Sequence, residues 1–377
     1  MADSYRPVII GAGVSGNALA YELTKLGEKP IVIEQKRDVL GKACAGIVSK
    51  RILKLVELPR SLVKNRVDRL VLHFPKGEVE VRGKAIVLDR EGFSEFLYER
   101  AKKEGTDYLF NERLMRFVVA DKVIGRTSKR SFKTDILIGA DGVDSVVAKK
   151  YGLSYRIESV VQAFGEYESD AVHVFLGKEY GYPFGYVIPY EKDMSIVGMG
   201  GSRESLERFL DFLGVRHVRK WQAGRIPVTL PKYTAFERVL LIGDAAGMVK
   251  ALTGGGIIMD LLVSKIAAKA IREGYERNDF STHFLKRHYE DVWKEKYFGE
   301  LKLAYKLRML YERMDEKDLN NLYDLFQKEE VLEIVEKYGD MDFYSGMTKR
   351  LMTNREVLKF ALSFFARHLS AIFLALS

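Results

Sequence analysis

Hydrophobic and polar positions at the start of the chain follow the pattern of a strand, a helix and a second strand. Arg6–Ile10 is a short apolar run that ends at a glycine. Val14–Leu26 has apolar residues at helical spacing, Gly27 ends this helix, and Pro30–Ile33 is a second apolar run. Such a strand–helix–strand unit indicates a parallel sheet.

Shorter elements are predicted over the next part of the chain. Ser49–Leu58 is typical of a short helix ended by a proline. Val67–Phe74 and Glu78–Arg82 alternate between apolar and polar residues on either side of a turn, which predicts a hairpin. Asp89–Glu104 has the spacing of a helix, and Asp135–Ala140 has that of a buried strand.

The pattern changes twice in the remainder of the chain. Val160–Val228 reads mostly as short strands with aromatic residues and glycines, as in an inserted antiparallel sheet. Val239–Ile242 predicts another buried strand and Gly256–Ile271 the helix after it. From Ser281 the pattern is nearly all helical, and we expect two or three packed helices over Phe284–Arg308.

Composition narrows the class of protein. The 377 residues are 47% hydrophobic and 30% charged, which excludes an intrinsically disordered chain. The net charge of +9 suits an anionic membrane surface, an acidic partner or a phosphorylated substrate, or else a solvated basic surface. No motif supports nucleic-acid binding. The preference for Lys, Arg and Glu over Asn and Gln is also seen in thermophile proteins.

The single cysteine, Cys44, cannot form a disulfide within the chain, and nothing indicates an oxidising compartment. The scattered histidines lack the spacing of metal ligands, so no metal is predicted. The polar first residues predict no signal peptide, and no stretch reaches the ~18 uncharged apolar residues of a membrane span. We therefore expect a cytoplasmic protein.

A glycine motif follows the first strand and opens the first helix. In Gly11-Ala-Gly-Val-Ser-Gly16, the first glycine permits a tight turn, the second lets the backbone approach a pyrophosphate, and the third lets the helix pack closely. The helix N-terminus, including Ser15, offers free N–H groups to phosphates. Glu34 ends the second strand, where a carboxylate can bind ribose hydroxyls. These residues predict a dinucleotide-binding unit, and the charge of Glu34 disfavours a 2′-phosphate.

Three later segments resemble those of flavoprotein hydroxylases and their relatives. Ile136-Leu-Ile-Gly-Ala-Asp-Gly-Val-Asp-Ser145 is similar to their GADG segment, and Leu240-Leu-Ile-Gly-Asp-Ala-Ala-Gly247 to their GDAAG segment. Leu88-Asp-Arg-Glu-Gly-Phe-Ser-Glu-Phe-Leu97 is similar to the start of their conserved helix. The resemblance covers roughly residues 6–275 and implies that the dinucleotide is FAD. The usual arginine after the GADG serine is replaced by Ala148, which disfavours an aromatic hydroxylase.

The resemblance assigns further residues to the cofactor. Asp244 is expected to bind the ribityl chain, and Arg90 to lie near the cofactor. Asp141 either contacts the cofactor or caps the following turn. The run Thr253–Ile257 begins the predicted helix that follows, and its N–H groups could face the flavin, whose reduced form is anionic. The remaining predicted cofactor contacts are Ala45, Gly46, Leu114, Gly255, Gly256 and Ile257.

One loop distinguishes the branches of this group of flavoproteins by its sequence. Leu40-Gly-Lys-Ala-Cys-Ala-Gly-Ile-Val-Ser49 resembles the cysteine-containing loop of the geranylgeranyl reductase family, which lies over the flavin ring. The resemblance makes Cys44 the candidate catalytic residue, either as a proton donor or as a residue that shapes the site. A lone cysteine is otherwise more often a small buried hydrophobic residue.

A second family pattern, Y-x-W-x-F-P, lines the lipid pocket of these reductases. Phe184, Tyr186, Ile188 and Pro189 occupy its positions here and are the predicted substrate-binding residues. Three of the four side chains differ from the pattern, with Tyr186 in place of tryptophan, but all remain bulky and apolar or amphipathic. Ordinary packing within a sheet is the alternative role for these aromatic residues.

Together these features predict an α/β protein with an α+β insertion. A Rossmann-like FAD-binding domain would comprise residues 1–66, 85–155 and 235–280, and an antiparallel-sheet substrate domain residues 67–84 and 156–234. A helical region would follow over residues 281–377. Its last part, Phe360–Ser377, would either lie at the inner face of the membrane or pack on the protein itself.

The resemblance implies an archaeal-type reductase that hydrogenates isoprenoid double bonds of a lipid or a prenylated quinone, by hydride transfer from reduced FAD. One dinucleotide motif alone is present, so the electron donor would be NAD(P)H docking transiently or a small ferredoxin-like carrier. A flavin monooxygenase acting on an aromatic or hydrophobic substrate is one alternative. A non-catalytic prenyl carrier is the other.

Overall fold

The computed structural model describes residues 5–40 and 43–368, and its core is a mostly parallel sheet with the strand order β16-β17-β10-β1-β2-β6. Val8–Ile10 (β1) pairs in parallel with Ile31–Ile33 (β2) on one side and Leu137–Gly139 (β10) on the other. The other strands of this sheet are Asp107–Leu109 (β6), Ala235–Phe236 (β16) and Val239–Leu241 (β17). The predicted parallel sheet is therefore confirmed.

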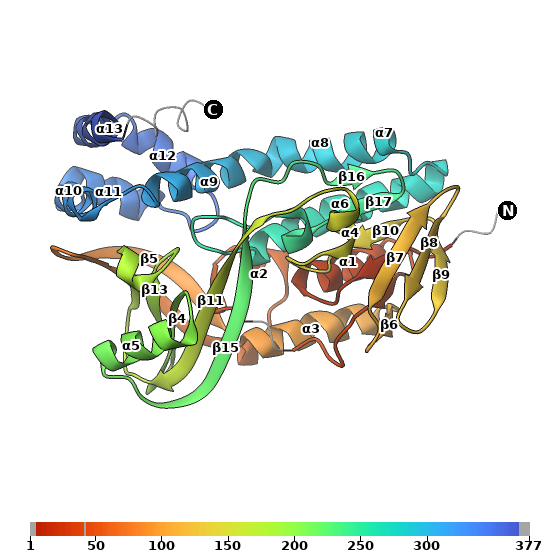
Figure 1. The fold of residues 1–377 in the computed structure, drawn as a ribbon, viewed down its shortest axis with the longest axis horizontal. Coiled ribbons are helices and arrows are strands. Elements are labelled where there is room, and N and C mark those ends of the chain that lie inside the picture. Colours follow the sequence, from red (N-terminus) through yellow and green to blue (C-terminus); the bar gives the residue numbers. More distant parts are fainter. Residues whose placement is uncertain (1–4, 41–42, 369–377) are drawn as a thin grey trace.

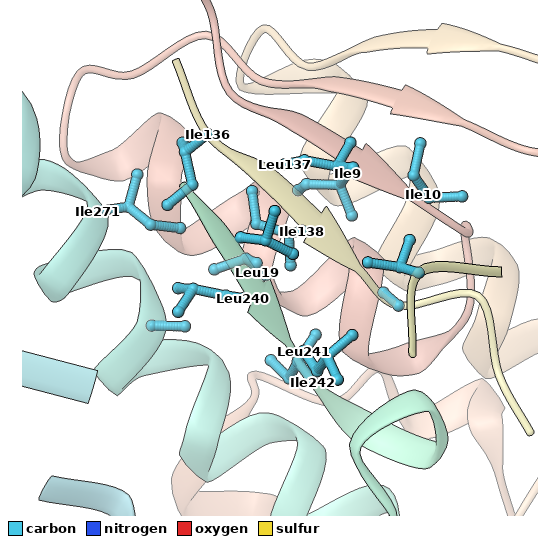
Figure 2. Packing of buried hydrophobic residues seen from close by; sticks show 14 of the residues in the cluster. Ile9, Ile10, Leu19, Ile136, Leu137, Ile138, Leu240, Leu241, Ile242 and Ile271 are labelled. Atoms are coloured by element: carbon cyan, nitrogen blue, oxygen red, sulfur yellow. The ribbon is translucent and has the colours of Figure 1, made fainter. Parts of the chain in front are cut away.

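Two helices follow the strands of this sheet and bury its apolar residues. Val14–Lys25 (α1) packs against Ile257–Arg277 (α6) and against Arg90–Lys103 (α3). Figure 2 shows how Leu19 of α1 and Ile271 of α6 meet the strand residues, all of them fully buried. The central strands β1, β2 and β17 consist of valine, isoleucine and leucine alone, as expected for a sheet covered on both faces.

A second, larger sheet has the strand order β15-β11-β14-β13-β12-β4-β5-β3. Most neighbours are antiparallel, but β12 lies parallel to β4. The predicted hairpin is present as Val63–Phe74 (β4) and Gly77–Leu88 (β5), with strands longer than predicted. The other members are Ile47–Ser49 (β3), Arg156–Glu166 (β11), Val172–Phe175 (β12), Gly185–Glu191 (β13), Met194–Gly200 (β14) and Arg216–Val228 (β15).

Two features of the middle region were not predicted. Val160–Val228 contains long strands and a helix, Arg203–Leu213 (α5), where the sequence pattern predicted mostly short strands. Leu114–Val119 (β7), Val123–Thr127 (β8) and Ser131–Thr134 (β9) form a separate antiparallel sheet. The short helices in this half are Ile52–Leu55 (α2), which is shorter than predicted, and Val146–Lys150 (α4).

The C-terminal region is helical, as predicted, but the expectation of two or three packed helices over Phe284–Arg308 is wrong. Thr282–Tyr311 is one uninterrupted helical run, made of α7 (Thr282–Leu285), α8 (Asp291–Trp293) and α9 (Gly299–Tyr311), with π-helical turns between them. No glycine or proline before Gly299 interrupts its pattern, and π turns add a residue without ending a helix.

Within the described residues, four further helices follow: Glu316–Phe326 (α10), Glu329–Tyr338 (α11), Ser345–Leu351 (α12) and Arg355–Arg367 (α13). Figure 1 shows α10 and α11 beside the β4–β5 hairpin, and both contact β5. Leu319 of α10 completes a buried cluster with Phe74, Val79 and Val81. Among the described helices, none has the length and apolar character that a membrane crossing requires.

Candidate functional site

A cavity of about 1130 Å³ is lined by residues of both large sheets. This volume exceeds that of most small-ligand pockets, which occupy ~300–1,000 Å³. The glycine loop before α1 and apolar side chains of the larger sheet both line it. These apolar lining residues are Val67, Leu70, Val160, Val172, Val174, Ile188 and Met199.

The three glycines of the loop have different surroundings. Gly11 has a φ of +105°, and a Cβ there would collide with the carbonyl of Ala140. A Cβ at Gly16 would collide with the carbonyl of Gly11, so this glycine allows close packing but does not line the cavity. A Cβ at Gly13 would meet no described atom within 4 Å. The second glycine therefore leaves the open space that a pyrophosphate needs.

The start of α1 is suited to an anion. No side chain of the described residues caps its N-terminus, and Ser15 of its first turn lines the cavity. The first N–H groups of a helix have no partner within the helix, and its dipole is positive at this end. The geometry thus provides a phosphate-binding position without a basic side chain.

Glu34 faces this loop from the end of β2. Its Oε2 accepts a hydrogen bond from the backbone N–H of Ala12 (2.8 Å), and its Oε1 accepts one from that of Lys36 (2.9 Å). These bonds fix the carboxylate at the edge of the cavity. Each carboxylate oxygen can accept a second hydrogen bond, as ribose hydroxyls would donate.

Asp244 and the start of α6 lie on the same cavity. Asp244 follows β17 at the beginning of a 3₁₀ turn, Gly243–Ala246. Gly255, Gly256 and Ile257 also line the cavity, and no described side chain caps α6. A second uncapped helix N-terminus therefore faces the cavity, where it would favour negative charge.

Asp141 caps the helix that follows it. Its Oδ1 accepts a hydrogen bond from the Ser145 hydroxyl (2.5 Å), and its Oδ2 accepts one from the Val146 N–H (2.7 Å). Burial raises the pKa of Asp141, and these hydrogen bonds oppose that rise. The capping alternative accounts for these contacts, although Asp141 also lines the cavity.

Arg90 and Leu114 border the cavity as well. Arg90 Nη1 donates a hydrogen bond to the Ser94 hydroxyl. Its Nε is buried and has no hydrogen-bond partner within the described part of the chain. A buried donor without a partner is costly, so this N–H would gain from an acceptor on a bound ligand.

The cysteine loop lies where the two sheets meet. Cys44, Ala45 and Gly46 line the cavity, and Cys44 is half-buried. Gly46 has a φ of +69°, and its carbonyl accepts a hydrogen bond from the Leu88 N–H (3.0 Å). The preceding loop positions 41–42 fall outside the described residues. The loop is therefore anchored on β5 with its thiol at the cavity.

The predicted substrate residues divide into two groups. Phe184, Tyr186 and Ile188 line the cavity. Tyr186 and Ile188 are alternate residues of β13 and so share a face, and Phe184 directly precedes the strand. Pro189 is not among the described lining residues, and its carbonyl accepts a hydrogen bond from the Asn65 amide (3.3 Å). Its position one residue further along the strand turns it to the other face.

Lining residues from the C-terminal region were missed by the sequence analysis. Lys250 Nζ lies 2.7 Å from Asp342 Oδ1 and donates to the Met341 carbonyl (2.5 Å), and both charged side chains are more than 90% buried. This ion pair brings Met341 and Tyr344 to the cavity. No sequence motif indicates these residues, because they lie about ninety positions from Lys250 in the chain.

One group of described side chains has metal-ligand character, away from the cavity. Asp315, Asp318 and His368 have atoms within 4.8 Å of one another. Arg367 pairs with both aspartates, at 2.6 and 3.0 Å. A hydrogen bond from the Asp318 N–H, followed by that from Arg367, lowers the pKa of Asp315 to about 2. A cation already neutralises these carboxylates.

Solved structures with the same fold define the class. The chain has the fold of flavin-dependent oxidoreductases. A halogenase crystallised with FAD gives a TM-score of 0.67 at 14% identity, covering 99% of this chain and 91% of its own. A p-nitrophenol 4-monooxygenase from Pseudomonas putida gives a TM-score of 0.71 at 17% identity, covering 94% of this chain and 98% of its own. The predicted fold class is therefore confirmed.

More particular relatives are found among archaeal proteins. A digeranylgeranylglycerophospholipid reductase of Methanopyrus kandleri is 28% identical over 87% of this chain and 92% of its own length. A second such reductase, from Methanococcus vannielii, is 28% identical over 86% of this chain and 91% of its own length. A geranylgeranyl bacteriochlorophyll reductase-like protein of Thermoplasma acidophilum gives a TM-score of 0.81 at 21% identity, covering 96% and 99%. The predicted resemblance to geranylgeranyl reductases is confirmed, although no family model matches the chain.

Proposed function

We propose that the protein is an FAD-dependent reductase that hydrogenates isoprenoid double bonds of geranylgeranyl membrane lipids or prenylated quinones. The observation that carries the proposal is the continuity of one cavity from the glycine loop, past Cys44, to the apolar face of the larger sheet. A cofactor and a long apolar substrate can occupy its two ends at the same time. The archaeal reductases that match most of the chain support the same reaction.

The polar end of the cavity fits FAD. The open space at Gly13 and the uncapped α1 N-terminus suit the pyrophosphate, and Glu34 suits the adenosine ribose. Asp244 would bind the ribityl chain, and the start of α6 would face the pyrimidine edge of the flavin. The unsatisfied Nε of Arg90 provides a further donor.

When bound, FAD supplies the hydride chemistry, which no amino-acid side chain can perform. The chain itself binds and orients the two ligands and keeps water away from them. Its apolar wall, which includes Val172, Val174 and Ile188, suits a branched hydrocarbon. We also propose that residues 1–66, 85–155 and 235–280 act as the cofactor domain, with residues 67–84 and 156–234 as the substrate domain.

Cys44 is the proposed catalytic residue of the loop, with two roles to separate. Cys44 lines the cavity together with the glycine loop and the apolar residues of the larger sheet. If Cys44 donates a proton, Cys44→Ala should slow reduction ~10²–10⁴-fold, the usual contribution of a general acid. If the side chain only shapes the site, Cys44→Ala should reduce lipid at nearly the normal rate.

Electrons must reach the cofactor from outside the protein, from NAD(P)H or a ferredoxin-like carrier, and the net charge of +9 suits an acidic carrier. We further propose peripheral contact with the inner face of the membrane through α13. Leu358 and Leu362 of this helix are 40% and 71% exposed. The continuation of the predicted apolar segment, residues 369–377, falls outside the described residues.

The test is mass spectrometry of a geranylgeranylated phospholipid after anaerobic incubation with chemically reduced, FAD-loaded protein. A stepwise gain of two hydrogens per double bond is the expected result. A prenylated quinone is the second substrate to try. If both remain unchanged while the flavin stays reduced, the reductase proposal fails. Oxygen consumption coupled to substrate hydroxylation would then identify a monooxygenase.

A further inference from the structure

Four residues form a row across neighbouring strands of the larger sheet. Tyr186 of β13 pairs with Gly198 of β14, Gly198 pairs with Gln162 of β11, and Gln162 pairs with Gln222 of β15. Paired residues on adjacent strands point to the same face of a sheet. Tyr186 and Gln162 both line the cavity, so the row lies on its wall.

Gly198 lets the Tyr186 side chain lie across its strand. A Cβ at Gly198 would fall on the Tyr186 hydroxyl, so only glycine leaves room for it. The ring passes over β14, and the hydroxyl donates a hydrogen bond to Gln162 Oε1 (2.8 Å). The Tyr186 oxygen is therefore fixed by a side chain two strands away.

The hydrogen bonds continue from Gln162 to the protein surface. Gln162 Nε2 donates to Gln222 Oε1 (2.6 Å), and Gln222 Nε2 donates to Glu91 Oε1 (3.3 Å). Glu91 is also paired with Lys220 (2.6 Å). Gln162 is 2% exposed, so its amide has little access to solvent water. The row fixes the position of the Tyr186 oxygen through three successive hydrogen bonds.

The hydroxyl lies beside the cysteine loop. Burial, with a smaller contribution from the charge of Cys44, raises the pKa of Tyr186 above its ordinary value. The adjoining Ala43 packs at Gly224, two residues from Gln222 on β15. The phenol is therefore kept protonated across the physiological pH range, next to the loop that meets the proposed cofactor position.

We propose that Tyr186 is the proton donor of the reduction and that Gln162 positions its hydroxyl. The inference rests on the proposed function. Reduction adds a hydride, supplied by the reduced flavin, to one carbon of the double bond. At the other carbon, the Tyr186 hydroxyl turns its single proton away from Gln162 Oε1 and toward that carbon, and its O–H bond breaks as a new C–H bond forms. The phenolate left behind regains a proton from water once the product has left the cavity.

A weak acid is sufficient for this step. A carbon that gains electron density from hydride addition is far more basic than a phenolate, so proton transfer from a neutral phenol is downhill. A phenol that stays protonated is also the form needed for donation. The tyrosine stands where the resembling pattern has tryptophan, whose side chain has no hydroxyl group. Cys44 then keeps the shaping role.

The decisive variants are Tyr186→Phe, which removes one oxygen atom, and Gln162→Leu, which removes the acceptor. Tyr190→Phe is the matched control, because Tyr190 lies on the same strand outside the described cavity lining. In single-turnover reduction of the geranylgeranyl lipid, Tyr186→Phe should lower the rate ~10²–10⁴-fold, with lipid and FAD affinity unchanged. Gln162→Leu should lower it less, and Tyr190→Phe should not change it.

A second readout does not depend on turnover. In a spectrum of protein labelled with [¹³Cζ]tyrosine, the Tyr186 signal is the one that Tyr186→Phe removes. It should remain at the position of a neutral phenol through pH 10, where free tyrosine is half ionised. In Gln162→Leu this signal should shift, because its hydrogen-bond acceptor is lost.

The outcomes separate the two proposals. Wild-type protein that leaves the lipid and the prenylated quinone unreduced overturns the proposed function and the donor role with it. Wild-type reduction together with near-normal rates in Tyr186→Phe overturns the donor role alone. A Tyr186 signal that titrates near pH 10 overturns the buried, fixed hydroxyl on which the inference depends.

Discussion

The ion pair between Lys250 and Asp342 gives a sharp prediction for stability. Its side chains are only 9% and 7% exposed, and the Lys250 ammonium group also donates a hydrogen bond to the Met341 carbonyl. Asp342→Ala would leave an ammonium group buried without its counter-charge. Breaking such a pair from one side costs about 3–5 kcal/mol, a large part of a typical total stability of about 5–15 kcal/mol.

The assay is urea unfolding followed by circular dichroism. With a slope at the upper end of about 1–3 kcal/mol per molar urea, the Asp342→Ala midpoint should fall by roughly 1–2 M. Asp342→Asn keeps the shape of the side chain and a hydrogen-bond acceptor but not the charge. Its unfolding midpoint should therefore lie between those of wild type and Asp342→Ala. The double variant Lys250→Met/Asp342→Leu should recover most of the loss, because no charge remains buried.

The matched control is the exposed pair between Glu356 and Lys359, with side chains 31% and 57% exposed. Solvent screens this pair, so Glu356→Ala should leave the midpoint where it is. An Asp342→Ala midpoint equal to that of wild type would refute the reasoning. So would a double variant less stable than Asp342→Ala.

Three further predictions concern the glycine loop, Glu34 and two histidines. Gly16→Ala should prevent soluble expression, because its Cβ would collide with backbone, whereas Gly13→Ala should fold and bind FAD more weakly in a fluorescence titration. Glu34→Ala should weaken FAD binding about ten- to a hundredfold, the loss of charge-assisted hydrogen bonds worth about 1.5–3 kcal/mol, and unchanged affinity would exclude the ribose assignment. Burial lowers the pKa of both His73 and His173, so the unfolded chain takes up protons first as pH falls below 6.5. Urea unfolding at pH 7 and pH 5 should therefore show a larger loss of stability in wild type than in a variant with both changed to Gln.

The parts of the fold that depend on local pattern were predictable. Val8–Ile10 and Ile31–Ile33 are apolar runs next to glycine or proline, and the helix between them has clear spacing. The helix Arg203–Leu213 was missed although Ser202 caps its start and Gly214 ends it. Its cap signals were present, but the surrounding glycines and aromatic residues favoured strands. The register that aligns Tyr186 with Gln162 depends on tertiary pairing, so no local pattern contains it.

The residues of the candidate site also fall into two groups, those that a local motif predicts and those that only tertiary contacts bring to the cavity. Gly11, Gly13 and Glu34 are found by a motif because the chemistry of one turn requires them in a fixed spacing. Tyr344 has no such constraint: it reaches the cavity because Asp342 pairs with a lysine far away in the sequence. Asp141 shows the limit of a motif in another sense. The sequence left it with two roles, a cofactor contact or a cap; its hydrogen bonds fit the cap, and the cofactor contact stays a prediction.

The contribution of Met341 and Tyr344 has a consequence for how the protein is made. A ribosome releases the glycine loop, Cys44 and the sheet long before it releases these two residues. During synthesis the cavity therefore lacks part of its wall. The cavity wall is therefore completed only after the helical region has been synthesised.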